Sequence, residues 1–298
     1  MTSSTQGPFL VTGASGHLGR RVVELVLDAH AGPLMVTTRQ PDKLADLAAR
    51  GVQVRAADFT KPDTLVSAFA GARRALIVST DDLTPGQRFA SHKAAIDAAA
   101  AAGIRHIVYT SLTNPGADSP ISFAGDHAAT EAALVASGVP HTVLRNNLYT
   151  DLFLMTAPQV IASGTLYAAA GDGRVGYVTR EDCARAAAAA LLTAEGSHTF
   201  DITGPGLIAQ VDVARMLSEL SRRPVTYVPL AAADLHGALI GHGLPEALVA
   251  LLVSIDEAIA KGTLAVVSPA CEELTGRPPT SVRSFLEAHA GTLTGPTS

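Results

Sequence analysis

Short, nearly continuous apolar runs alternate with longer stretches of helical spacing through the first half of the chain. Continuous apolar runs are typical of strands in a parallel sheet whose two faces are both covered by helices. The pattern predicts strands over residues 9–12, 34–38, 52–56, 74–79, 106–110 and 141–144. It predicts helices between them over residues 18–29, 43–49, 64–70, 87–102 and 126–137. This alternation predicts an α/β fold with a doubly wound parallel sheet of the Rossmann type.

After residue 144 the pattern changes to longer helices with few strands between them. Helices are expected over residues 149–162, 181–193, 210–221, 231–240, 245–261 and 281–288, and strands over 199–202 and 225–228. We therefore predict two domains, a Rossmann domain over residues 1–147 and a smaller, mostly helical substrate lobe over residues 148–298. Segments within about 165–203 are expected to return to the sheet of the first domain.

Composition and charge narrow the class of protein. The 298 residues are 47% apolar and 16% charged, with 22 basic and 27 acidic residues, so a large core is expected and a nucleic-acid partner is not. Arg185, Pro245 and Asp256 interrupt the longest apolar stretches, which argues against a membrane span. The N-terminus lacks the regions of a secretion signal and the two cysteines make no disulfide framework, so a cytoplasmic protein is expected.

Directly after the first predicted strand, three glycines follow the spacing G-x-x-G-x-x-G. Gly13 permits a tight turn, Gly16 lets the backbone approach a pyrophosphate, and Gly19 allows the next helix to pack closely on the strand. The helix N-terminus adds unpaired amides and the positive end of its dipole. The position between strand and helix favours a dinucleotide site over a plain tight turn. The candidate residues are Gly13, Ala14, Ser15, Gly16, His17, Leu18 and Gly19.

The residue that follows the second strand indicates which dinucleotide is bound. In NAD-binding loops, an acidic residue about 20 positions beyond the last glycine binds the ribose hydroxyls. That position is Arg39, which suits a 2′-phosphate, and Lys43 one turn later adds a second positive charge. The alternative is a pair of solvated surface cations. We predict NADPH as the cofactor, with NADH bound more weakly.

In a doubly wound sheet, ligands bind beyond the carboxyl ends of the strands, so the residues that follow each strand are candidates. Asp58 and Phe59 are expected to bind and cover the adenine, although each can also serve as a cap or a core residue. Asn146 and Asn147 offer amides near the nicotinamide, although one of them can instead pin its own loop. The further cofactor candidates are Ser79 and Thr80.

Several segments are specific enough to compare with known families. They are residues 12–19, 106–111, 127–131 and 144–151, with residues 171–173 and 178–180 in addition. Together they resemble the NmrA-like group of atypical short-chain dehydrogenases, which includes quinone and triphenylmethane reductases. The resemblance extends from Phe9 to about Ala288. It implies NADPH binding and direct hydride transfer to a small molecule, and it leaves the substrate open.

Short-chain dehydrogenases that reduce ketones use a serine and a Tyr-x-x-x-Lys pair. The resemblance places Phe123 at the tyrosine position and His127 at the lysine position, while Ser111 remains. Without a placed acid, reduction of an aliphatic ketone loses about 10²- to 10⁴-fold. Quinones and other activated acceptors need less help, so we predict a flat, conjugated substrate. Tyr149 and Phe153, together with Phe123, are expected to line its site.

Three side chains are candidate proton donors, and each has an alternative. His127 is placed to orient the ribose, relay a proton or bind the substrate oxygen, or it lies on a helix surface. Tyr109 is a donor or a core residue, and Ser111 is the third candidate. Two other functions stay open: a redox-sensing regulatory protein that binds NADP(H), and a carbonyl or imine reductase with another donor. The sequence shows no cluster of metal ligands and is compatible with a homo-oligomer.

Overall fold

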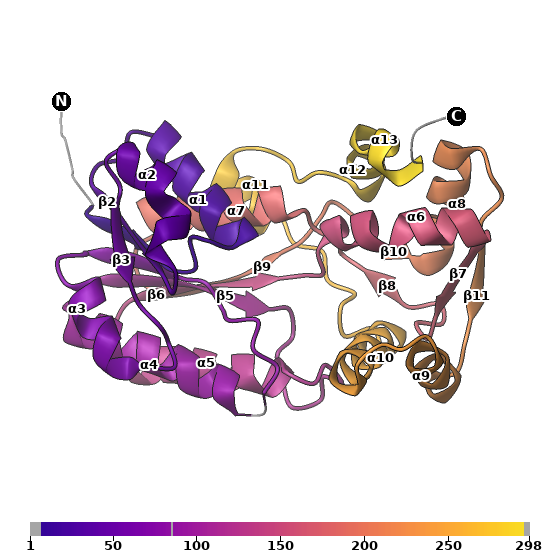
Figure 1. The fold of residues 1–298 in the computed structure, drawn as a ribbon, viewed down its shortest axis with the longest axis horizontal. Coiled ribbons are helices and arrows are strands. Elements are labelled where there is room, and N and C mark those ends of the chain that lie inside the picture. Colours follow the sequence, from indigo (N-terminus) through magenta and orange to yellow (C-terminus); the bar gives the residue numbers. More distant parts are fainter. Residues whose placement is uncertain (1–6, 85, 295–298) are drawn as a thin grey trace.

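The computed structural model describes residues 7–84 and 86–294. Seven strands form its main sheet in the order β3-β2-β1-β4-β5-β6-β9, and all neighbours are parallel (Figure 1). The strands are β1 (Phe9–Val11), β2 (Leu34–Thr38), β3 (Gln53–Ala56), β4 (Arg74–Ile77), β5 (His106–Leu112), β6 (His141–Asn146) and β9 (His198–Ile202). The predicted doubly wound parallel α/β fold is confirmed.

The order of the strands fixes where a ligand can bind. The chain runs outward from β1 through β2 to β3, and then returns to β4 on the other side of β1. Phe9 of β1 therefore pairs with Leu34 on one side and with Arg74 on the other. The connections that leave the carboxyl ends of β1 and β4 diverge to opposite sides, which opens a crevice between them.

Helices cover both faces of the main sheet (Figure 1). One face carries α1 (His17–Asp28), α2 (Ala45–Ala49), α7 (Arg180–Thr193) and α11 (Ala270–Thr275), and the other carries α3 (Leu65–Phe69), α4 (Gln87–Ala101) and α5 (Ala124–Ala136). Two 3-10 helices, η1 (Pro41–Leu44) and η2 (Pro62–Thr64), precede α2 and α3. Within the described residues, no helix is long and apolar enough to cross a bilayer.

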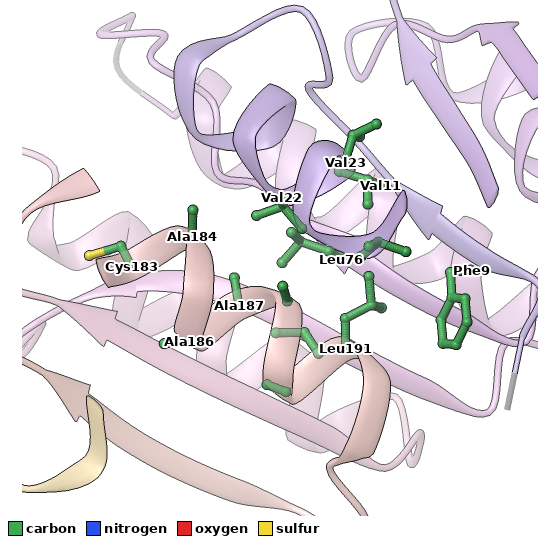
Figure 2. Packing of buried hydrophobic residues seen from close by; sticks show 14 of the residues in the cluster. Phe9, Val11, Val22, Val23, Leu76, Cys183, Ala184, Ala186, Ala187 and Leu191 are labelled. Atoms are coloured by element: carbon green, nitrogen blue, oxygen red, sulfur yellow. The ribbon is translucent and has the colours of Figure 1, made fainter. Parts of the chain in front are cut away.

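The packing of α7 shows why an alanine run is placed in this part of the chain. Figure 2 shows Ala184, Ala187 and Leu191 of α7 in one cluster with Val22 of α1 and Leu76 of β4. All five side chains are buried. Because alanine is small, α7 can lie close to both the sheet and α1, and the apolar surface that is buried there anchors this late segment to the first domain.

The second lobe has its own core and two small sheets. Its helices are η3 (Thr150–Leu152), α6 (Phe153–Ser163), α8 (Gln210–Ser221), α9 (Ala232–Gly241), α10 (Glu246–Ala260), α12 (Val282–Ala288) and α13 (Ala290–Thr294). β7 (Thr165–Ala168) pairs with β11 (Thr226–Pro229), and β8 (Arg174–Val175) pairs with β10 (Ile208–Ala209). Ile161, Tyr177, Leu217 and Phe285 are among its core residues. This core also includes Leu112 at the end of β5, so the lobe packs over the carboxyl edge of the main sheet.

The division between the two domains is not a single point in the chain. α7 and β9 follow the first elements of the lobe but belong to the main sheet and its helical cover. They lie within the range, about 165–203, for which a return to the sheet was expected, whereas β7 and β8 pair within the lobe. A boundary near residue 147, with α7 and β9 assigned to the first domain, is the division that we propose.

Some elements differ from the predicted ones. The helix that was expected over residues 149–162 begins only at Phe153, because Tyr149 is extended and forms a β-bridge with Val178 before the short η3 turn. The elements β7, β8, β10 and α11 were not predicted. Each has at most six residues, which is too few for a periodic pattern to emerge from the sequence.

Candidate cofactor and substrate cleft

A cleft of about 770 Å³ opens at the carboxyl edge of the main sheet. From the sheet side it is lined by residues 13, 15–19, 37–39, 57–60, 78–82, 110–112 and 146–149, which follow or end six neighbouring strands. From the other side it is lined by Leu152, Leu251 and Ile255 of the second lobe. The cleft therefore lies where the strand order reverses, which is the usual ligand site of this fold.

The structure brings the predicted cofactor residues to this cleft, except for Ala14 and Lys43. Ala14 is buried beneath the loop, and its backbone N–H donates to the carbonyl of Thr37 at 3.3 Å. Lys43 is exposed on η1 and does not line the cleft. Of the predicted catalytic and substrate residues, Ser111, Phe123 and Tyr149 line the cleft, whereas Tyr109, His127 and Phe153 do not.

The glycine loop has the geometry that its spacing predicted. Gly13 has a φ of +63°, in the left-handed region that favours glycine. The backbone N–H of Gly16 donates to the Gly13 carbonyl at 2.9 Å, which closes the turn. A Cβ atom at Gly19 would overlap the Gly13 carbonyl oxygen and lie 2.8 Å from its carbon. Glycine at position 19 is therefore needed for α1 to start directly against the loop.

The start of α1 suits a phosphate group. Gly16 precedes the helix and makes no side-chain cap, and the first turn contains no acidic residue. The first backbone N–H groups of the helix therefore have no side-chain acceptor and face a cleft, where an anion would satisfy them. Arg39 is exposed at the end of β2 and lines the same cleft. These features fit a dinucleotide that carries an additional phosphate.

The adjacent loops are held by local hydrogen bonds. Asp58 accepts hydrogen bonds from the backbone N–H and the hydroxyl of Thr60, at 3.0 and 2.8 Å. The backbone N–H of Ser79 donates to the hydroxyl of Thr110 at 2.9 Å. These bonds hold the backbone at two places where it borders the cleft.

Tyr109 and His127, two of the predicted proton donors, lie in a buried cluster with His92. The Tyr109 hydroxyl is 2.7 Å from Nδ1 of His127 and 3.1 Å from Nδ1 of His92. Since Nε2 of His92 accepts the backbone N–H of Thr80 at 2.9 Å, its hydrogen is on Nδ1, which faces the hydroxyls of Tyr109 and Thr130. Burial lowers the pKa of each histidine to about 3, so both are neutral near pH 7.

Ser111, the third predicted donor, already makes a strong hydrogen bond within the protein. Its hydroxyl donates to Oε1 of Glu131 at 2.6 Å. The same carboxylate is held by the guanidinium of Arg145, with contacts of 3.0 and 2.6 Å. The Ser111 proton therefore points to a paired carboxylate that it helps to stabilise.

The aromatic side chains divide between the cleft and the second core. Phe123 precedes α5 and lies under the guanidinium of Arg88, whose central carbon is 4.4 Å from the ring centroid. Tyr149 lines the cleft, and burial raises the pKa of its phenol. Phe153 packs instead against Tyr177, with ring centroids 5.0 Å apart, so the structure does not bring it to the cleft.

The two asparagines at the end of β6 have different surroundings. Asn147 pins its loop, since its Nδ2 donates to the carbonyl of Leu264 at 3.0 Å and its Oδ1 accepts the N–H of Leu148 at 2.8 Å. Asn146 donates from Nδ2 to the Tyr149 hydroxyl at 3.3 Å, and its buried Oδ1 has no hydrogen-bond partner within the described chain. Asn146 therefore offers an acceptor beside the cleft, which a ligand N–H can satisfy.

Sequence reasoning missed several residues that line the cleft, among them Arg88, Arg180, Leu251 and Ile255. Arg88 is the second residue of α4, so it lies outside the strand ends at which cofactor residues are expected. Leu251 and Ile255 lie one turn apart on α10. Their spacing indicates an apolar helix face, but it does not predict which part of the protein that face contacts. Arg180 begins α7, and its position relative to the sheet depends on contacts far apart in the chain.

Known proteins resemble this chain over nearly its whole length. A family model described as NAD(P)H-binding matches residues 13–194. Quinone oxidoreductase 2 of Escherichia coli is 37% identical over 276 residues, which cover 91% of this chain and 95% of that protein.

Two solved structures also match the fold closely. The crystal structure of the E. coli NADPH-dependent quinone oxidoreductase in complex with NADPH has a TM-score of 0.89 and 34% identity, covering 94% of this chain and 99% of that chain. The crystal structure of Citrobacter sp. triphenylmethane reductase with NADP(H) has a TM-score of 0.87 and 31% identity, with the same coverage of 94% and 99%.

Proposed function

The chain belongs to the NAD(P)H-binding family and is an NAD(P)H-dependent oxidoreductase, and from this premise we propose that it transfers hydride from NADPH to a quinone or a similar flat, activated acceptor. The resemblance of its sequence to the NmrA-like reductases is confirmed by these relatives. The choice of acceptor is our proposal. It rests on the chemistry of the cleft.

The observation that carries the proposal is that the cleft has an apolar end which the predicted proton donors Tyr109 and His127 do not line. Phe123, Tyr149, Leu251 and Ile255 line the cleft. The candidate donors Tyr109 and His127 are buried outside it, and Ser111 donates to Glu131. Tyr149 lines the cleft, but burial raises the pKa of its phenol, which makes it a weaker acid.

The end of the cleft beside the glycine loop is lined by residues that suit NADPH. The uncapped start of α1 and the glycine loop would hold the pyrophosphate, and Arg39 would pair with the 2′-phosphate. Asp58 and Phe59 line the same cleft and would border the adenine. When bound, NADPH supplies a hydride from its nicotinamide. The chain's own contribution is to bind both reactants, orient them and exclude water.

Without a placed acid, the site would select among acceptors. Hydride transfer to an aliphatic ketone builds charge on one oxygen, and a missing general acid costs about 10²- to 10⁴-fold in rate. A quinone spreads the charge over a conjugated anion that water can protonate afterwards. The names of the relatives, a quinone oxidoreductase and a triphenylmethane reductase, support acceptors of this activated kind.

The other functions considered are less well supported. A carbonyl or imine reductase would need a donor in the cleft, and Tyr109 and His127 do not line it. A redox sensor needs no acceptor site, whereas this cleft extends beyond the glycine loop to apolar residues of the second lobe, including Leu251. The extension favours an enzyme that holds a second molecule.

Stopped-flow mixing of the NADPH-loaded protein with acceptors tests the proposal. We expect rapid oxidation of NADPH with a naphthoquinone and rates near the protein-free background with an aliphatic ketone of similar size. The panel includes a cationic triarylmethane dye as a second activated acceptor. Turnover no faster than background with every quinone and with the dye contradicts the proposal, as does a ketone rate that equals the quinone rate.

A further inference from the structure

Arg88 is a buried cation beside the apolar end of the cleft. It is 5% exposed, lies on α4, and is one of the residues that line the cleft together with Phe123. Burying a guanidinium without a counter-charge is unfavourable, so a partner is expected close by. Burial accordingly lowers the pKa of this arginine, which nevertheless remains charged near neutral pH.

The protein supplies Arg88 with few partners. Its Nε donates to the carbonyl of Asp82 at 3.2 Å, and its guanidinium carbon lies 4.4 Å from the centroid of the Phe123 ring. The carboxylates of Asp81, Asp82 and Asp126 act on it electrostatically, but within the described residues none lies within 4.0 Å. The terminal N–H groups make no hydrogen bond inside the described chain.

Two other arginines near the cleft, Arg145 and Arg180, have carboxylate partners within the protein. Arg145 holds the carboxylate of Glu131 with two hydrogen bonds. The Arg180 guanidinium lies 3.9 Å from a carboxylate oxygen of Asp151, and the backbone N–H of Arg180 donates to the same carboxylate at 2.8 Å. Arg88 lines a cleft in which a ligand is expected, and it differs from both because no carboxylate of the described residues lies within 4.0 Å of it.

We propose that Arg88 binds the oxyanion that forms on the acceptor during reduction, and so makes the site selective for acceptors that become anions. The inference rests on the proposed function and adds the class of substrate. Phe123, which lies under Arg88, is the residue that the sequence places at the position of the tyrosine acid. A fixed cation then takes over part of the task of the missing proton donor.

The chemistry balances without an acid in the site. The quinone accepts two electrons and one hydrogen from NADPH as the C–H bond at the nicotinamide breaks, and one of its oxygens is left as an oxyanion. Arg88 stabilises this charge by hydrogen bonds and by electrostatic attraction, and gives up no proton. The anion takes its proton from water, so that NADPH, quinone and one proton yield NADP⁺ and hydroquinone.

The same charge acts against another class of acceptor. A cationic triarylmethane dye is neutralised by hydride and forms no anion, and before the reaction it would sit beside a like charge. This protein should therefore prefer quinones to cationic dyes, and removal of the Arg88 charge should reduce the preference.

Substitution of Arg88 tests this directly. The variants are Arg88→Leu, which removes the charge, and Arg88→Lys, which keeps it. The matched control is Arg105→Leu, because Arg105 is exposed at the amino end of β5, at the opposite edge of the sheet. NADPH binding, measured by fluorescence titration, reports whether each variant is folded. We expect Arg88→Leu to lower kcat/KM for a naphthoquinone by about 100-fold while the dye rate stays or rises.

A binding measurement separates this inference from the proposed function. A hydroxynaphthoquinone is a vinylogous acid that is anionic at neutral pH and carries its charge on the quinone oxygens, and its methoxy analogue is neutral. With NADP⁺ present, calorimetry should show tighter binding of the anion to the wild type and to Arg88→Lys, by roughly 10-fold or more. In Arg88→Leu this difference should disappear.

Each outcome decides one of the two proposals. A wild type that reduces no acceptor but still binds the anion through Arg88 contradicts the proposed function and leaves the anion site standing. An Arg88→Leu protein that binds NADPH normally and keeps both the ratio of quinone to dye turnover and the preference for the anion overturns the role of Arg88. If Arg88→Leu does not bind NADPH, Arg88→Gln is measured by the same criteria.

Discussion

The arginines that line the cleft differ in whether the protein already neutralises them. Arg180 lies beside Asp151, whereas Arg39 and Arg88 have no carboxylate within 4.0 Å in the described part of the chain. Two cations without close protein partners in one cleft favour the binding of anionic ligand groups there. We assign the 2′-phosphate of the cofactor to Arg39 and the oxyanion of the acceptor to Arg88.

Arg39 should therefore decide between the two nicotinamide cofactors. Arg39→Asp is expected to weaken NADPH binding by roughly 100-fold, because a charge-assisted pair is replaced by two like charges. NADH lacks the phosphate, so its affinity should change by less than about threefold. Fluorescence titration with each cofactor measures both. Arg105→Asp is the control for a charge change outside the cleft, and equal losses for NADPH and NADH with Arg39→Asp would falsify the assignment.

Substitution of Lys43 gives a second test of which cation binds the 2′-phosphate. It is exposed on η1 and does not line the cleft. In the same titration, Lys43→Asp should weaken NADPH binding less than Arg39→Asp, because solvent screens a charge at that position. An effect as large as that of Arg39→Asp would place Lys43 at the phosphate after all.

The sequence pointed to Arg39 and missed Arg88 for a physical reason. The glycine loop follows β1 and Arg39 follows β2. Because these two strands are neighbours in the sheet, the separation between the loop and Arg39 along the chain is predictable. Arg88 reaches the cleft from the start of α4, and its place depends on how α4 packs. Local spacing encodes the first relation and does not encode the second.

At the scale of elements, burial on both faces made β1, β2, β4 and β5 visible as apolar runs, whereas β3 lies at the sheet edge and is exposed at two of its four positions. β4, for example, is buried at every position. β9 was predicted over residues 199–202, within the range expected to return to the main sheet, but its place beside β6 depends on contacts far apart in the chain. β8 and β10 have two residues each and exist because they pair with each other. Elements that depend on a distant partner are not readable from local pattern.

The junction between the glycine loop and α1 gives a test at this scale. Gly19→Ala places a methyl group against the Gly13 carbonyl, so the loop or the helix must move. We expect NADPH binding to weaken at least about 10-fold and the free energy of unfolding to fall by roughly 1–3 kcal/mol. Fluorescence titration and urea unfolding measure the two effects.

The matched control is another helical glycine that meets no neighbours. A Cβ atom at Gly125, in α5, would have nothing within 4 Å. Gly125→Ala should leave NADPH binding unchanged and stabilise the protein by up to about 1 kcal/mol, because alanine favours the helix. If both substitutions weaken NADPH binding equally, close packing at Gly19 is not what positions the loop.

At the scale of the whole molecule, the cleft is built from parts of the chain that are far apart. Its cofactor side comes from strand ends that the sequence located, and its other side includes Leu251 and Ile255 of α10. The spacing of these two residues on a helix was visible, but the contact of α10 with the cleft depends on the packing of the second lobe. Tyr109 and His127 were singled out by their position, and only the packing of α4 and α5 on β5 shows that both are buried.

The buried cluster of His92, Tyr109 and His127 makes the stability of the whole protein depend on pH. Burial lowers the pKa of His92 and His127 from 6.5 to about 3. Between these values the unfolded chain binds protons that the folded protein does not, so stability is full above pH 6.5 and is lost as the pH falls toward 3. Each histidine contributes about 1.4 kcal/mol per pH unit over that range.

Urea unfolding at about pH 7 and about pH 5 should therefore show a loss of roughly 4 kcal/mol from these two histidines together. His127→Gln should lower the pH dependence by about one half of that amount, because one buried imidazole is no longer there to take up a proton on unfolding. His242→Gln is the control, since His242 is exposed on the surface. If His127→Gln and His242→Gln leave the same pH dependence as the wild type, the buried cluster is not what couples folding to protonation, and other groups must carry the acid sensitivity of the molecule.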